Sequence, residues 1–124
     1  MAAIRKFEEI KAWQKARELA HEIYKTCSSG AISQDYGLRN QICRAAVSSM
    51  SNIAEGFGRS SNKDFAHFLD MARGSTMETQ SLLYVALDIG YINQASFDRL
   101  YKLAEETSSL IIGFSSYLRA NQPK

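Results

Sequence analysis

Two carboxylate–histidine pairs have the spacing that most resembles a reaction centre. Glu18 precedes His21, and Asp64 precedes His67, each by three positions. Such pairs hold di-iron and di-manganese centres in helical bundles when all the side chains point into the core. At about 100° per residue, Glu18 and His21 instead lie away from the apolar stripe of their segment, and His67 lies far from the apolar face of its own. We therefore interpret them as solvated side chains, and we expect no bound metal ion and histidines that are dispensable for folding.

The remaining signals for enzyme chemistry are weaker still. Cys27 and Cys43 lie in apolar stretches without an adjacent histidine, and two thiols are too few for a disulfide framework or a structural zinc site. They are predicted to be buried free thiols. The glycines at positions 56 and 58 neither follow a strand nor precede a Lys-Ser/Thr pair, so they do not form a phosphate-binding loop. We expect no cofactor and no enzymatic activity.

The composition is that of one globular domain. The chain has 124 residues, of which 45% are hydrophobic and 23% charged, and a domain of this size folds without disulfides or metals. Its only proline is Pro123, so nearly the whole chain can form long helices. The N-terminus does not resemble a signal peptide, and no apolar run approaches the roughly 20 residues that span a bilayer. We expect a single cytoplasmic domain over residues 1–124 that does not enter a membrane.

Four segments show helical periodicity, and short polar breaks separate them. They span residues 7–28, 36–57, 62–89 and 94–119. Residues 120–124 are predicted to be a frayed tail. Gly30 and Gly90 suit left-handed helix ends, and Ser61 with Asp64 resembles a capping box. Because short connections force neighbouring helices to run antiparallel, the predicted fold class is all-α, an antiparallel up-down-up-down four-helix bundle.

The second predicted helix has two apolar stripes. One consists of Leu38, Ile42, Ala45, Ser49 and Ile53, and the other of Cys43, Val47, Met50, Ala54 and Phe57. The stripes are turned by about 100° from each other, so the helix needs two partners. The first stripe can face the bundle core, and the second a neighbouring helix or another subunit. Cys43, Val47, Met50 and Ala54 are therefore the candidate oligomer interface, although a helix deep in its own bundle explains the pattern equally well.

The third predicted helix contains a glycine, Gly74, in its interior. Glycine there costs up to about 1 kcal/mol relative to alanine. Either a close approach of another helix at Gly74 compensates for this cost, or the glycine reflects neutral drift.

A series of short motifs resembles one known family. The motifs are Trp13-Gln14-Lys15-Ala16, Tyr36-Gly37-Leu38, Gln41-Ile42, Arg44-Ala45-Ala46, Asn52-Ile53-Ala54-Glu55-Gly56, Phe65 with Phe68-Leu69, Ala72-Arg73-Gly74-Ser75, Glu78 and Gly90-Tyr91-Ile92. Each is weak alone, but together they cover nearly the whole chain in order. They resemble the four-helix-bundle proteins encoded by intervening sequences within bacterial 23S rRNA genes. Glu55, Gly56, Ser75 and Glu78 are the matching positions that we single out as family-motif residues.

The resemblance implies an antiparallel four-helix bundle from a family without established catalytic activity. A related protein, the accessory factor of diversity-generating retroelements, forms a five-subunit barrel and works with a reverse transcriptase and RNA. By resemblance, this chain is expected to form a homopentamer that binds RNA or a nucleic-acid-handling protein. That relative is strongly basic, whereas this chain has a net charge of only +2, which weakens a direct transfer of RNA binding. The alternative is a structural protein–protein interaction module that binds no nucleic acid.

Five basic side chains are the candidate RNA contacts. They are Arg39, Arg44, Arg59, Lys63 and Arg73. In an antiparallel hairpin, Arg59 and Lys63 come together at one end of the bundle, and repetition around a ring would make a positively charged rim that binds phosphates. The alternative is that these are ordinary solvated charges, some paired with Glu55, Asp64 or Glu78. Few aromatic residues are expected to be free to stack on bases, so sequence specificity should be poor.

Overall fold

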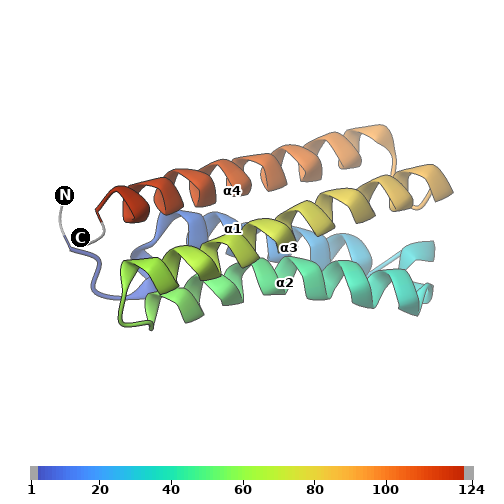
Figure 1. Cartoon of the computed structure of the whole chain (residues 1–124). Helices are drawn as coiled ribbons and strands as arrows, with labels where there is room; N and C mark the ends of the chain where they lie inside the picture. The colour runs from blue at the N-terminus through green and yellow to red at the C-terminus, as the bar shows by residue number, and fades with distance from the viewer. Residues whose placement is uncertain (1–2, 122–124) are drawn as a thin grey trace.

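Four long helices form an antiparallel bundle in the computed structural model of the chain, which describes residues 3–121 (Figure 1). They are α1 (Lys11–Cys27), α2 (Tyr36–Phe57), α3 (Asn62–Ile89) and α4 (Gln94–Ala120), and two short 3-10 helices, η1 (Phe7–Glu9) and η2 (Ala31–Gln34), precede α1 and α2. Each long helix packs against the one that follows it, and α1 also packs against α4. No strand occurs in this part of the chain. The predicted fold class is confirmed.

The bounds of α2 and α3 agree with the predicted segments because strong end signals flank them. The Ser61 hydroxyl accepts a hydrogen bond from the backbone N–H of Asp64, as the capping box predicted. At the other end of α3, Gly90 has the left-handed φ of +90° that suits glycine. Side-chain oxygens also cap α2 and α4, from Asp35 and Asn93 respectively.

The predicted start of the first helix at residue 7 is wrong. The backbone of Ile10 is extended, with ψ of 120°, so η1 ends before it and α1 begins after it. This break turns Ile10 into the core, where it is 2% exposed. It also brings the Phe7 ring edge-on to Trp13, with 5.1 Å between ring centroids. The apolar contacts of Ile10 and Phe7 compensate for the helical hydrogen bonds that are lost at this break.

Two smaller predictions about helix ends also need correction. The C-cap of α1 is Ser28, which has a right-handed conformation, so Gly30 does not cap this helix. Gly30, with φ of +73°, instead turns the chain into η2. Ala120, assigned to a frayed tail, is the last residue of α4. The remainder of that predicted tail, residues 122–124, lies outside the described residues.

The core consists of two apolar halves that meet at a band of small polar side chains. Ser49, Thr76, Thr79 and Thr107 lie at mid-bundle and are completely buried. The Ser49 hydroxyl is 2.8 Å from the Thr76 hydroxyl, which itself donates to the carbonyl of Ala72. Thr107 donates to a carbonyl of its own helix in the same way. Among residues 3–121, no buried side-chain nitrogen or oxygen lacks a partner, so the band costs little of the stability gained from the apolar halves.

At Gly56, α2 packs against α3 without room for a side chain. A β-carbon at this position would lie 2.7 Å from Cδ1 of Phe65 and 2.8 Å from Cβ of Phe68. Gly74 is exposed, and a β-carbon there would meet nothing within 4 Å. The predicted close helix approach at Gly74 is therefore wrong, and the close approach belongs to the other helix of the pair.

We expect the Gly56→Ala substitution to destabilise the protein by about 1–2 kcal/mol, because overpacking outweighs the gain in helix propensity. Urea denaturation followed by circular dichroism would measure the change. Gly74→Ala is the matched control, and it should stabilise the protein by about 0.5–1 kcal/mol because its added methyl group meets no neighbour. Equal effects of the two substitutions would contradict the proposed close approach at Gly56.

Asp35 joins two turns at the end of the bundle opposite the α2–α3 turn. One carboxylate oxygen caps α2, and the other accepts a 2.9 Å hydrogen bond from the hydroxyl of Tyr91, which follows α3. This hydrogen bond raises the pKa of Tyr91, because ionisation would remove the donated proton and place two negative charges together.

We expect the Tyr91→Phe substitution to lower the melting temperature by a few degrees, because it removes the hydrogen bond between the two turns. Thermal denaturation followed by circular dichroism would test this. Tyr36→Phe is the control, since the Tyr36 hydroxyl makes no hydrogen bond within residues 3–121. A melting temperature unchanged by Tyr91→Phe would show that the link contributes nothing.

Candidate interaction surfaces

The residues that suggested a metal centre lie on the outer surface of the bundle and not in its core. Glu18, His21, Asp64 and His67 are all exposed, as their helical phase predicted. Glu18 forms a 3.3 Å ion pair with Lys15 on the same helix. Within residues 3–121, no group of three or more His, Cys, Asp or Glu side chains is placed to hold a metal ion.

The two cysteines are buried free thiols, as predicted. Cys27 on α1 and Cys43 on α2 face each other, and burial, reinforced by the neighbouring thiol, raises the pKa of Cys27 to about 12. Burial also raises the pKa of Cys43. Because the thiolate is the reactive form, neither side chain is prepared for nucleophilic chemistry at neutral pH.

The five basic candidates do not form one cluster. Arg39 and Arg59 are separated by 20 positions along α2 and its C-terminal turn, which places them roughly 30 Å apart. Arg39 donates to the carbonyl of Ser33 and stacks on the Tyr36 ring, so it fixes η2 against α2. Arg44 and Glu78, a family-motif residue, line a polar hollow of about 470 Å³ between α2 and α3. Arg73 is exposed midway along α3.

None of the five basic candidates forms an ion pair with a carboxylate of the described chain. The ion pairs within residues 3–121 are Lys15–Glu18, Arg99–Glu22 and Arg119–Asp70. The predicted pairing of some of them with Glu55, Asp64 or Glu78 is therefore wrong, whereas the alternative that they are ordinary solvated charges is not tested by the ion pairs.

Arg59 and Lys63 do lie at the same end of the bundle, on either side of the α2–α3 turn. The Arg59 guanidinium stacks over the half-buried Phe68 ring, 4.5 Å from its centroid. The N-terminal segment reaches the same place, because Ala3 and Ile4 line a cavity together with Arg59. Figure 1 shows this segment running beside the α2–α3 turn.

Two further basic residues therefore join this end of the bundle. Arg5 and Lys6 directly follow Ile4 and are exposed. We call Arg5, Lys6, Arg59 and Lys63 the basic end. Sequence reasoning missed Arg5 and Lys6 because nothing in their spacing indicates where the N-terminal segment packs. Acidic side chains at positions 8, 9 and 64 lie near the same end and reduce its net charge.

The second apolar stripe of α2 is largely covered by the chain itself. Cys43 is buried, and Met50 and Ala54 are half-buried against the core. Only Val47, at 36% exposed, is open to solvent. It lines a hollow of about 590 Å³ with Tyr24 of α1, an exposed aromatic residue that sequence reasoning did not select. A contact surface for another subunit on this face would therefore centre on Val47 and Tyr24.

The other family-motif residues divide into packed and exposed positions. Gly56 allows the close approach of α2 and α3, and the Ser75 hydroxyl donates to that of Ser48 across the same pair of helices at 2.9 Å. Asn52, buried beside them, donates to the Ser48 carbonyl and hydroxyl. Glu55 is exposed on the outer surface.

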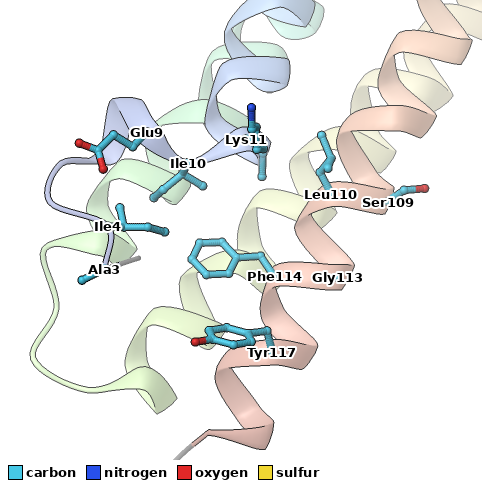
Figure 2. A pocket seen from close by; sticks show the side chains of 11 residues that line it. Ala3, Ile4, Glu9, Ile10, Lys11, Ser109, Leu110, Gly113, Phe114 and Tyr117 are labelled. Atoms are coloured by element: carbon cyan, nitrogen blue, oxygen red, sulfur yellow. The ribbon is translucent and has the colours of Figure 1, made fainter. Parts of the chain in front are cut away.

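An apolar groove of about 520 Å³ lies between the N-terminal segment and α4. Figure 2 shows the rings of Phe114 and Tyr117 pointing from α4 toward Ile4 and Ala3. Four tyrosines, Tyr24, Tyr36, Tyr84 and Tyr117, are between 42% and 59% exposed. Two of them already contact other side chains of the chain, Tyr36 through the Arg39 guanidinium and Tyr84 through the Phe97 and Tyr101 rings. That few aromatic residues are free to stack on bases therefore stays a prediction.

None of the helices among residues 3–121 has the length and apolar character needed to cross a membrane.

Comparison with other proteins identifies the family. A comparison with curated proteins finds no match. A crystal structure of a protein of unknown function from the S23 ribosomal protein family of Bacteroides thetaiotaomicron VPI-5482 has the same fold. The two structures match with a TM-score of 0.76, and their sequences are 24% identical. The match covers 84% of this chain and 97% of the Bacteroides chain. A family model described as 23S rRNA-intervening sequence protein matches residues 8–113, and the chain therefore belongs to that family.

Proposed function

We propose that this protein is a non-enzymatic four-helix bundle that assembles with copies of itself and binds RNA through its basic end. The supporting observation is that four basic side chains from the N-terminal segment and the α2–α3 turn lie at one end of the bundle. Within residues 3–121, none of them is paired with a carboxylate. Such side chains can contact phosphates without first breaking an internal ion pair.

Self-assembly would compensate for the low charge of a single chain. With a net charge of +2 and acidic side chains near the basic end, one subunit would bind RNA weakly. The family resemblance favours five subunits, and a ring would present five basic ends to one RNA. Multivalent contact of this kind raises avidity without any new type of interaction.

A second candidate function is that of a protein interaction module. The supporting observation is the number of exposed apolar side chains on α3, namely Met71, Met77, Val85 and Ile89. Val85 and Ile89, four positions apart, lie on one face of α3, and apolar side chains gathered on one face favour a protein partner over RNA. RNA binding and its dependence on salt distinguish the two functions.

We expect the Arg59→Glu/Lys63→Glu double substitution to weaken binding to structured RNA by about tenfold or more at low salt, because it replaces two phosphate contacts with repulsion. The plot of log affinity against log salt concentration should become shallower by about 2. Filter binding across a salt series would measure both effects.

Lys25→Glu/Lys102→Glu is the control, since it makes the same change in net charge at exposed positions toward the other end of the bundle. Equal losses in the two double variants, or no binding by the wild type at low salt, would contradict RNA binding at the basic end.

We expect the wild type to have about five times the 13.9 kDa mass of one chain in light scattering at micromolar concentration. Val47→Glu should dissociate this assembly to folded monomers, because Val47 is exposed in the single chain and its replacement leaves the core intact. Val85→Glu, at a similarly exposed position on α3, is the control that should leave the mass unchanged. A wild-type monomer would refute self-assembly, and an unaffected mass for Val47→Glu would exclude this face.

A further inference from the structure

A cavity of about 430 Å³ opens directly beside the basic end. It lies between the N-terminal segment, the α2–α3 turn and the last turns of α4. Its lining includes an apolar wall from Phe57, Phe65 and Phe114 and a polar wall from Arg59, Ser60 and Asn62. The cavity adjoins the apolar groove of Figure 2, since Ile4, Phe114 and Tyr117 line both.

Tyr117 supplies an aromatic face to this cavity. Its ring is 42% exposed although it lines both hollows. The neighbouring Phe114 ring supports it, with 6.4 Å between centroids and 31° between planes, and Phe114 packs edge-on against the buried Phe65 ring. Tyr117 thus borders a ring that contacts the core, while much of the residue remains exposed.

The polar wall carries donors and acceptors that the other described residues leave largely unused. The Arg59 guanidinium is fixed over the Phe68 ring and makes no ion pair with residues 3–121. The side-chain amide of Asn62 makes one long contact, 3.4 Å to the carbonyl of Asn121. Its oxygen and its second N–H can therefore accept from and donate to a ligand.

We propose that this cavity binds one unpaired nucleotide of a single-stranded RNA, with the base stacked on Tyr117 and a phosphate on Arg59. The proposal rests on the proposed function, RNA binding at the basic end. An aromatic ring, an amide and a guanidinium match the base face, the base edge and the phosphate of a nucleotide. The volume is within the range of about 300–1,000 Å³ for small-molecule pockets. A base inside a duplex has no free face to stack, so the site selects unpaired RNA.

The test compares two fluorescent oligonucleotides of equal length and charge, one a single-stranded RNA and the other its abasic counterpart, which keeps the phosphates but lacks the bases. In fluorescence polarisation at low salt, the wild type should bind the RNA about fivefold or more tightly than the abasic strand, because base stacking contributes in addition to charge. Tyr117→Ser should remove this preference, whereas Tyr117→Phe, which keeps a ring, should retain it. Tyr84→Ser, at an exposed tyrosine of α3 outside the cavity, should also retain it.

Each other outcome overturns a defined part of the proposal. Equal wild-type affinity for the two strands overturns the nucleotide site but leaves phosphate binding at the basic end intact. Absence of binding to either strand at low salt overturns both the site and the proposed function. A preference that survives Tyr117→Ser places the stacking elsewhere and overturns the assignment to this cavity. The wild-type comparison of the two strands tests the nucleotide site even where a variant fails to fold.

Discussion

The packing of α2 against α3 depends on the absence of a side chain at Gly56. The Phe65 and Phe68 side chains occupy the space that a β-carbon would need, so the last turn of α2 lies directly against the first turns of α3. Two hydroxyl pairs, Ser49 with Thr76 and Ser48 with Ser75, continue the contact toward mid-bundle. Small residues at these positions of the interface let the two helices pack closely from the α2–α3 turn toward mid-bundle.

This close packing also determines what the adjacent turn can present to solvent. Because Phe68 lies against the end of α2, its outer face is available to support the Arg59 guanidinium. Phe65 extends inward and contacts the Phe57 and Phe114 rings, which form the apolar wall of the cavity at this end. Gly56, a family-motif residue without a functional group of its own, therefore helps to position both the Arg59 guanidinium and the aromatic wall of the cavity.

The sequence predicted the features that depend on local signals, and it missed those that depend on tertiary packing. The bounds of α3 follow from Ser61 and Gly90, whose side-chain and backbone preferences act within a few residues. The break at Ile10 has no such signal, because its cause is the burial of that side chain against other helices. Likewise, composition alone does not distinguish a glycine that faces a neighbouring helix, such as Gly56, from one that faces solvent, such as Gly74.

The candidate site shows the same division. The proximity of Arg59 and Lys63 follows from an antiparallel hairpin and was predictable, whereas the contribution of Arg5 and Lys6 depends on where Ile4 packs. Because Ile4 is partly buried against the apolar half of the core at this end, the contacts that hold the N-terminal segment also complete the cavity and the basic end. A ligand bound there would touch the N-terminal segment, the α2–α3 turn and α4 at once. Its binding energy would then add to the stability of the part of the bundle where three separate segments meet.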